Sequence, residues 1–198
     1  MKIVITAPSL DPSQNVSGVS TVANFIIENN SKQEYIHFLQ GKKDNEGRGL
    51  NRVLAILRAY KQWGKVIKNA DLIHYSFPLS APSIIRDPLF MLRVLRMRKK
   101  MVIHIHGGLF LTSAKVPFFL KKILKWVFSW NVPFIVLSEQ EKNILINRFG
   151  AKNVEVLPNC PSVPSNDFYD TVSANTESKE AKSLTLGYLG RIEPNKGI

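Results

Sequence analysis

Short apolar runs alternate with amphipathic stretches along most of this chain. The predicted strands are 2–7, 34–39, 71–76, 101–106, 133–138 and 154–157. Between them apolar residues recur at helical spacing, which predicts helices at 19–29, 50–68, 83–99, 116–130 and 139–149. The strands are continuous apolar runs, as is typical of a parallel sheet buried on both faces. The alternation therefore predicts an α/β fold, a Rossmann-like parallel sheet with helices on both faces.

Two of these helices show the pattern in particular residues. In helix 19–29, one face collects Val22, Phe25, Ile26 and Asn29. Helix 50–68 has its large apolar residues at helical spacing: Leu50, Val53, Leu54, Leu57, Tyr60 and Ile67. This is the pattern of amphipathic helices that pack their apolar face on a sheet.

The composition is that of an ordinary folded domain. The 198 residues include 44% hydrophobic and 21% charged residues, enough for a sizeable core. The single cysteine, Cys160, excludes an internal disulfide and fits a reducing compartment. No Cys/His cluster has metal-ligand spacing, and no apolar run approaches the roughly 20 residues that cross a bilayer.

Charge is distributed unevenly along the sequence. The net charge is +12, and no acidic residue occurs between Glu46 and Asp71 or between Asp87 and Glu139. Such asymmetry predicts an anionic partner, which could be a membrane surface, a nucleic acid or a phosphorylated substrate.

Segments 86–100 and 115–130 interleave cations with large apolar residues. The predicted membrane-contact residues are Arg93, Arg96, Arg98, Lys121, Lys122 and Lys125. The alternative is a pair of crossover helices whose apolar residues pack on the sheet and whose lysines face water. Nucleic acid ranks lower, because the aromatic residues lie in apolar runs rather than in polar stretches suited to base stacking. We expect contact with an anionic membrane surface and no nucleic acid.

Ligands of open parallel sheets bind beyond the carboxyl ends of the strands. After the first strand, Gly18 could let the backbone approach a ligand at the start of a helix, although Ser17 could simply be the N-cap of that helix. After the fourth strand, His106 is followed by Gly107, an arrangement that favours a functional histidine beside a ligand. His104 and His74, within their strands, are expected to be structural.

Two serines also end strands of the predicted sheet. Ser76 is expected to line the same acceptor-side cleft, together with Ser17 and Gly107. Ser138 is expected mainly to cap the following helix, with Glu141 at the position of a capping box, and it could also line the site.

The last part of the chain changes character. Residues 162–183 are rich in polar residues and are predicted to be a flexible linker. Residues 184–198 begin with an apolar run and continue with Gly190-Arg191 and Lys196-Gly197, which could receive a phosphate. The predicted organisation is a domain at 1–161, the linker, and the truncated start of a second domain at 184–198.

Gly190-Arg191 and Lys196-Gly197 resemble the signature that opens the nucleotide-sugar-binding domain of GT-B glycosyltransferases of the family 4 type. The Gly18 loop and the His106 turn resemble motifs of the family's N-terminal domain. Ser17 stands where the family has a first glycine, and Cys160 replaces the glycine of its Pro-Asn-Gly turn. The resemblance implies that residues 1–161 form the acceptor-side domain.

In that family, Arg191 and Lys196 would bind the donor diphosphate together with the Gly18 loop, and His106 would contact the transferred sugar or the acceptor. The implied activity is retaining transfer of a sugar from a nucleotide-sugar to a polysaccharide, glycolipid or small-molecule acceptor, in the cytoplasm or peripherally on the inner face of the membrane. No cofactor is implied beyond this donor substrate. The chain alone is expected to be inactive and to bind nucleotide-sugars weakly. The alternative is a stand-alone acceptor- or membrane-binding module that needs a separate donor-domain subunit.

Overall fold

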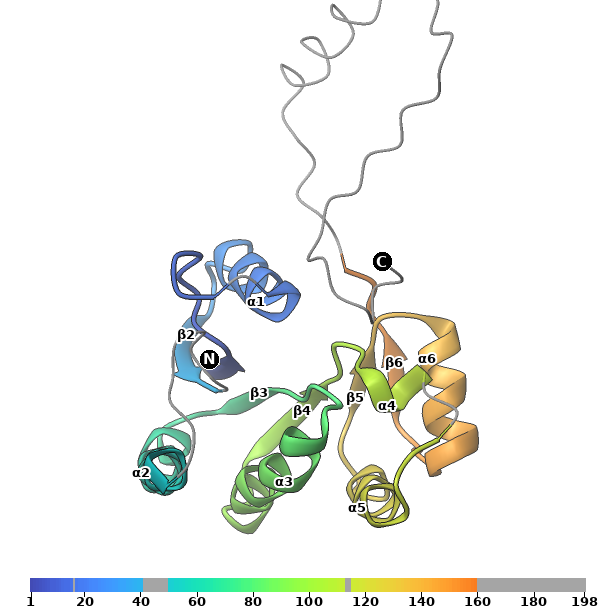
Figure 1. The fold of residues 1–198 in the computed structure, drawn as a ribbon. Helices are drawn as coiled ribbons and strands as arrows, with labels where there is room; N and C mark the ends of the chain where they lie inside the picture. The colour runs from blue at the N-terminus through green and yellow to red at the C-terminus, as the bar shows by residue number, and fades with distance from the viewer. Residues whose placement is uncertain (16, 41–49, 113–114, 160–198) are drawn as a thin grey trace, which may run out of the picture. The chain divides into compact units, whose positions relative to one another are not determined.

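The computed structural model describes residues 1–15, 17–40, 50–112 and 115–159 (Figure 1). The chain divides into two units, Met1–Asn159 and Cys160–Ile198, and the structure describes the first. The predicted linker and second-domain start lie outside the described residues, as do Arg191, Lys196 and Cys160.

Six strands of the first unit form one sheet, and all their pairings are parallel. The strands are β1 (Lys2–Ala7), β2 (Glu34–Leu39), β3 (Leu72–Ser76), β4 (Lys100–His104), β5 (Phe134–Val136) and β6 (Val154–Val156). Their order is β2-β1-β3-β4-β5-β6, so the direction of the strand order reverses between β1 and β3. This confirms the predicted Rossmann-like parallel sheet. In folds of this kind the reversal point is where ligands usually bind.

Helices cover the two faces of the sheet unequally. The helices are α1 (Gly18–Glu28), α2 (Leu50–Lys68), α3 (Ala81–Arg96), α4 (Leu109–Thr112), α5 (Phe118–Phe128) and α6 (Glu139–Ile144). Figure 1 shows α2, α3 and α5 side by side on one face and α1 on the other. The main core lies under α2, α3 and α5, and a smaller cluster joins α1 to Ile5 and Ala7.

The predicted apolar face of α2 is wrong in its first half. Val53, Leu54 and Leu57 are exposed, whereas Trp63 and Ile67 are fully buried. Trp63 sets the orientation of the helix, because its ring packs against several aromatic side chains and its Nε1 donates to the Phe90 carbonyl at 2.9 Å. The helix has more apolar residues than the face against the sheet can bury.

The face that α1 turns to the sheet overlaps only in part with the predicted one, because Ile26 belongs to both. Ala23 is buried, with Ile26 and Ile27 beside it, while Asn29 is exposed just after the helix. A small residue at the centre lets the helix lie close to β1.

The last helix of the unit matches its predicted range and adds one irregularity. After α6, a π-helical turn (η1) runs from Leu145 to Phe149 and ends at Gly150, whose φ is +78°. A glycine in the left-handed region is a common way to end a helix. The short helix α4 was not predicted from the sequence.

Candidate functional site

The predicted site residues of the first unit lie at one edge of the sheet. All strands are parallel, so their carboxyl ends share one edge. Gly18 begins the helix that follows β1, Ser76 ends β3, His106 follows β4, and Ser138 follows β5. This placement agrees with the strand-end rule used on the sequence, while the roles of these residues remain predictions.

Ser17 and Gly18 have separate structural settings. The Ser17 hydroxyl caps α1 by accepting from the Ser20 amide at 3.2 Å, and Asn15 Nδ2 donates to the Ser17 and Ser20 hydroxyls at 3.0 and 2.8 Å. Ser17 is therefore engaged in capping. Gly18 is exposed, and a Cβ placed on it would meet no atom within 4 Å. The backbone at the start of α1 is thus open to an approaching ligand.

Three histidines form a column on the face of the sheet that α1 covers in part. His74 lies opposite Ile5, a member of the cluster under α1, and therefore points to the same face. His74 Nε2 lies 3.1 Å from His104 Nδ1, and their rings stack with centroids 5.3 Å apart. The His104 and His106 ring centroids are 4.0 Å apart. His74 and His104 are buried and bonded to each other, as expected of core, hydrogen-bonded histidines.

Burial keeps this column neutral. It lowers the pKa of His74 to about 4, with a smaller effect of neighbouring His104, and it lowers the pKa of His104 to about 4. The pKa of His106 falls to about 3, mainly through burial and further through the other two imidazoles. At neutral pH each ring is therefore an uncharged imidazole that can donate one hydrogen bond and accept another.

Within the described part of the chain, His104 and His106 each have a buried Nε2 without a hydrogen-bond partner, and His106 differs from His104 in lying beyond the end of β4. The side chain is half-buried, and its Nε2 is buried without a hydrogen-bond partner in the described part of the chain. A buried polar atom left without a partner costs about 1–3 kcal/mol. At a ligand-binding edge, such an atom is a candidate to bond a ligand hydroxyl.

The loop after β4 is fixed against the loop after β3. The Phe77 amide donates to the His104 carbonyl at 2.8 Å, and the Leu79 amide donates to the Gly107 carbonyl at 3.4 Å. A Cβ on Gly108 would lie 2.8 Å from the Leu79 backbone nitrogen, and the φ of Gly108 is +130°. The backbone that lies close to Gly108 is therefore that of Leu79, so this glycine makes room for the neighbouring loop and not for a ligand. This packing holds the backbone that follows His106.

Ser138 has the predicted capping geometry. Its hydroxyl accepts from the Glu141 amide at 3.2 Å, and Glu141 Oε2 accepts from the Leu137 amide at 2.8 Å. The predicted N-cap at Ser138 is confirmed, while the Glu141 side chain bonds the amide of the residue before the cap and not the amide of Ser138 itself, as a capping box would require. A Cβ on Gly107 would meet only Glu141 Oε1, at 3.7 Å, so there is space beside Gly107 at this edge.

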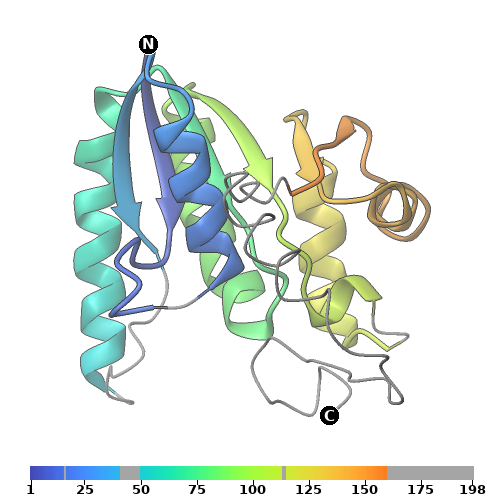
Figure 2. The same ribbon diagram turned by 90° about the horizontal axis from the view of Figure 1, so that it is seen from above.

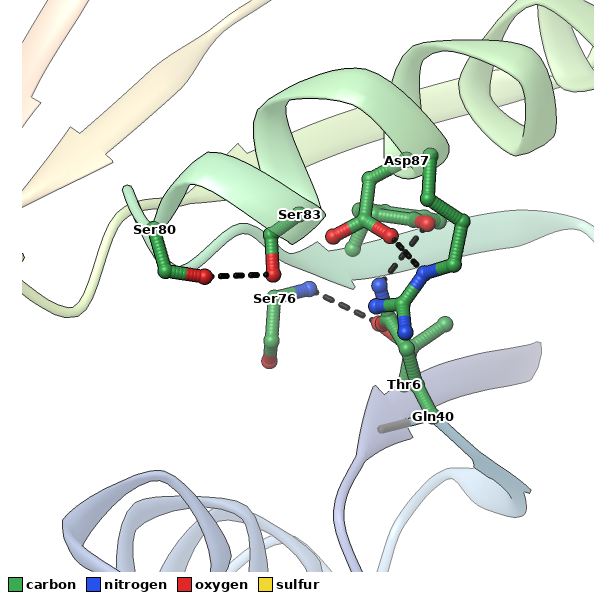
Figure 3. Close-up of polar contacts among 8 residues, drawn as sticks. Thr6, Gln40, Ser76, Ser80, Ser83 and Asp87 are labelled. Carbon is green, nitrogen blue, oxygen red and sulfur yellow. Dashed lines mark hydrogen bonds and ion pairs between the residues drawn. The ribbon is translucent and has the colours of Figure 1, made fainter. Parts of the chain in front are cut away.

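A polar cluster that the sequence did not predict lies where the strand order reverses (Figure 3). The Ser76 amide donates to Thr6 Oγ1 at 2.9 Å, which ties β3 to β1. The Gln40 amide donates to the Tyr75 hydroxyl at 2.8 Å. These side chains come from segments up to 70 residues apart, so no local pattern identifies them.

The charged member of this cluster is Asp87 of α3. Its carboxylate is fully buried and pairs with Arg86 Nε at 2.6 Å. Burial raises the pKa of Asp87 to about 6, although Arg86 and, less strongly, Gln40 act to lower it. The remaining acceptors, Asp87 Oδ2 and Gln40 Oε1, are buried and lack a partner within the described ranges. Turning the Gln40 amide by 180° would let it accept from Tyr75 and donate to Asp87, which would satisfy both atoms.

The predicted membrane-contact cations have different environments. Arg93 is engaged within the protein, because its Nη1 donates to the Tyr60 carbonyl at 2.7 Å and its guanidinium lies 4.8 Å from the Tyr60 ring centroid. Of the other predicted membrane-contact cations, Lys121 is half-buried, and the remaining four are exposed: Arg96, Arg98, Lys122 and Lys125.

Neither a metal-binding cluster nor a membrane-spanning helix occurs within the described ranges. Residues 1–15, 17–40, 50–112 and 115–159 hold no group of three or more His, Cys, Asp or Glu side chains that could bind a metal ion. Across the same ranges no helix combines the length and the apolar character that crossing a bilayer requires.

The first unit is a Rossmann-like α/β domain whose predicted site residues gather at the carboxyl edge of a parallel sheet. Residues 28–161, about two thirds of the chain, match the family model described as Glycosyltransferase Family 4. The protein belongs to this family. No curated protein matches the chain.

Proposed function

We propose that the protein takes part in transferring a sugar from a nucleotide-sugar to a polysaccharide, glycolipid or small-molecule acceptor, with retention of configuration. Membership of glycosyltransferase family 4 supports the reaction class. The observation that supports a role for this domain is the Nε2 of His106 at the carboxyl edge of β4, which is buried and has no hydrogen-bond partner among the described residues.

In this proposal His106 bonds a hydroxyl of the transferred sugar or of the acceptor. The low pKa of its imidazole keeps the ring uncharged at neutral pH, so the contact is a neutral hydrogen bond. The substrate hydroxyl would supply the hydrogen bond that Nε2 lacks among the described residues. The backbone bonds of Phe77 and Leu79 hold the loop that carries the histidine in place for this contact. A side chain held in a fixed position beside the substrate contributes to the rate of reaction, because it does not have to be oriented during the reaction.

The donor phosphates are assigned to the start of α1. Its first backbone amides have no helical partner, and the helix dipole favours negative charge there. Gly18 leaves this position open. By the resemblance described above, Arg191 and Lys196 would add charge stabilisation to the departing diphosphate. Both lie outside the described residues.

Replacing His106 tests the proposal most directly. His106→Ala should lower kcat/KM for sugar transfer by about 10²-fold, because a positioned hydrogen-bonding group at the reacting sugar is lost. Release of nucleoside diphosphate from UDP- and GDP-sugars can be followed with a mixed pool of glycolipid and glycan acceptors. The measurement uses the longest natural polypeptide that contains this chain.

His37→Gln is the matched control for that measurement. His37 lies on edge strand β2, where its Nε2 is 3.1 Å from the Ala7 carbonyl, and it has no role in the proposal. Its replacement should leave transfer unchanged. If His106→Ala retained full activity while folding normally, the role proposed for His106 would be wrong.

Gly18→Ala tests the donor position separately. Because a Cβ at Gly18 meets no protein atom, stability should be unchanged, but the methyl group would intrude between the backbone and a bound phosphate. We expect the KM for the nucleotide-sugar to rise about tenfold, the effect of roughly 1.4 kcal/mol. An unchanged KM would mean that the donor does not approach α1 at Gly18.

A further inference from the structure

Arg86 is a largely buried cation near the carboxyl edge of the sheet. Helix α3 begins just after the end of β3 and runs back along the sheet, so its second turn, which carries Arg86, lies near that edge (Figure 2). The Arg86 side chain is 17% exposed, and its partner Asp87 is fully buried. Desolvation offsets much of the attraction in a buried ion pair, so such a pair is weak evidence of a stabilising role. Buried ionisable groups at an edge where ligands bind favour a functional role instead.

The pairing with Asp87 uses only part of the guanidinium. Arg86 Nε donates to Asp87 Oδ1 at 2.6 Å, whereas Nη1 and Nη2 have no partner among the described residues. Neither atom is one of the buried nitrogens that lack a partner, so both reach the protein surface. The N–H groups of Nη1 and Nη2 are therefore available to a ligand.

Hydroxyl groups lie near the pair (Figure 3). Ser83 and Asp87 are one turn apart on the same side of α3. Ser80 donates to the Ser83 hydroxyl at 3.0 Å, which leaves the Ser83 hydrogen without an acceptor in the described part of the chain. The Ser76 hydroxyl at the end of β3 makes no hydrogen bond within the described ranges, since the Ser76 amide is the group that binds Thr6. These hydroxyls add neutral donors to the charged donors of Arg86.

This set of donors selects an oxyanion as the ligand. The planar fork of a guanidinium matches the two oxygens of a carboxylate or a phosphate, and the charge strengthens both hydrogen bonds. Hydroxyl donors suit the remaining oxygens of such a group. A neutral sugar could be held by the hydroxyls alone and would not need a buried cation.

Asp87 leaves room for a second negative charge beside Arg86. The groups that face the carboxyl are Arg86 on the same helix, the Tyr75 ring of β3 and the Gln40 amide after β2, so Arg86 is the one cation of this cluster. Burial raises the pKa of Asp87 to about 6. A bound anion would raise this pKa further, and the carboxyl could then take up a proton near neutral pH as the anion binds.

We propose that Arg86, together with the Ser76 and Ser83 hydroxyls, binds a carboxylate or phosphate group of the sugar acceptor. This Arg86 subsite makes the acceptor an acidic one, such as a glycan that contains uronic acid or a phosphorylated sugar. The inference rests on the proposed sugar transfer and adds the class of acceptor. Because β3 is the neighbour of β4 in the sheet, an acceptor anchored there would lie beside the strand that leads to His106.

Calorimetric titration of the full chain tests the subsite. Separate arms at about pH 7.5 use D-glucuronate, inorganic phosphate and neutral D-glucose, each with saturating UDP and GDP so that a donor site is occupied. At least one of the two anions should bind with a Kd of about 1 mM, and glucose should bind at least about tenfold more weakly. The anion that binds more tightly identifies the acidic group as carboxylate or phosphate.

Two variants should change anion affinity in opposite directions. Arg86→Gln/Asp87→Asn removes both charges without leaving either one buried alone, and it should weaken anion binding at least about tenfold. Asp87→Asn keeps the cation and removes the repulsion, so it should tighten anion binding by at least about fivefold. An ion pair with only a structural role would give neither effect.

Arg96→Gln is the matched control. Arg96 lies on the same helix and loses the same charge, but it is exposed and ends α3 at the opposite edge of the sheet (Figure 2). Its replacement should change anion affinity by less than about twofold. Circular dichroism and urea midpoints of each variant show whether the fold is retained.

Four results would overturn the subsite. They are equal anion binding by the parent protein and Arg86→Gln/Asp87→Asn, weaker binding by Asp87→Asn, a loss on Arg96→Gln as large as that of the double variant, and binding that disappears when UDP and GDP are present. Sugar transfer measured in parallel separates this inference from the proposed function. Anion binding without transfer would refute the proposed reaction and leave the subsite, whereas transfer without anion binding would refute the subsite alone.

Discussion

Lowering the pH from about 7 to about 5 should reduce the free energy of unfolding by about 4 to 5 kcal/mol. The cause is the neutral histidine column. Burial lowers the pKa values of His74 and His104 to about 4 from 6.5. Between these two values the unfolded chain binds protons that the folded chain does not bind, so acid favours unfolding. Stability is complete above about pH 6.5 and is lost as the pH falls toward the folded values. Each of these two histidines contributes about 2 kcal/mol of that loss by pH 5.

Asp87 acts in the opposite direction. Its pKa in the folded protein is raised to about 6 from 3.8, so the folded chain takes up this proton first and stability rises as the pH falls from about 6 toward 4. By pH 5 this gain is about 1 kcal/mol, since about one pKa unit separates the pH from the folded value. It offsets only part of the loss from the two histidines, and His106, whose pKa is lowered to about 3, adds a further loss of about 2 kcal/mol by pH 5. The net effect is therefore acid destabilisation.

Urea unfolding followed by circular dichroism across this pH range measures the effect. His74→Gln and His104→Gln should each make the loss with acid smaller, because each removes one proton-binding group from the unfolded state. Asp87→Asn should make the loss steeper, because it removes the opposing group. The comparison uses the pH dependence within each variant, because the substitutions also change stability at neutral pH.

Two outcomes would contradict this account. A free energy of unfolding that stays constant between pH 7 and 5 would mean that the column takes up protons in the folded state as readily as in the unfolded state. A flatter curve for Asp87→Asn would mean that the carboxyl is ionised in the fold and contributes stability as an anion.

The strands were predictable because each is a compact apolar run buried on both faces, and β1 and β2 match their predicted ranges. The faces of the helices were harder to predict. Helix α2 carries apolar residues around more of its surface than the sheet can cover, and Trp63, absent from the predicted face, decides which side is buried. Periodicity identifies a helix, whereas the fit of one large side chain sets its rotation.

In the candidate site, too, some residues could be predicted from the order of the elements, whereas others depend on packing between distant segments. His106, Gly18 and Ser76 were identified because the carboxyl ends of parallel strands meet at one edge, a rule that needs only the order of elements. The contacts of Thr6 with Ser76 and of Gln40 with Tyr75 arise from the sheet register between distant segments. Asp87 gave a signal in the sequence, because it is a lone acid in a basic and apolar stretch, but its burial depends on packing that the sequence does not show.

Gly108→Ala should lower the free energy of unfolding by about 3 kcal/mol, through two additive causes. The φ of +130° is a backbone conformation that alanine adopts with strain, and such strain costs about 1–3 kcal/mol. The new Cβ would also lie 2.8 Å from the nitrogen of Leu79, so one of the two loops would have to shift at a further cost of about 1–3 kcal/mol. The contact is with backbone, which cannot turn away as a flexible side chain can.

Alanine substitutions at two other glycines distinguish backbone strain from steric overlap when urea unfolding of each variant is measured. Gly150 has a φ of +78° and open space around its Cβ position, so Gly150→Ala should cost only the strain, about 1 kcal/mol. Gly18 has neither constraint, so Gly18→Ala should leave urea stability unchanged or raise it slightly. If Gly108→Ala cost no more than Gly150→Ala, the loops after β3 and β4 would have to separate easily. The backbone beside His106 would then be far less firmly held than the contacts of Leu79 and Phe77 indicate, because those contacts are what join the two loops.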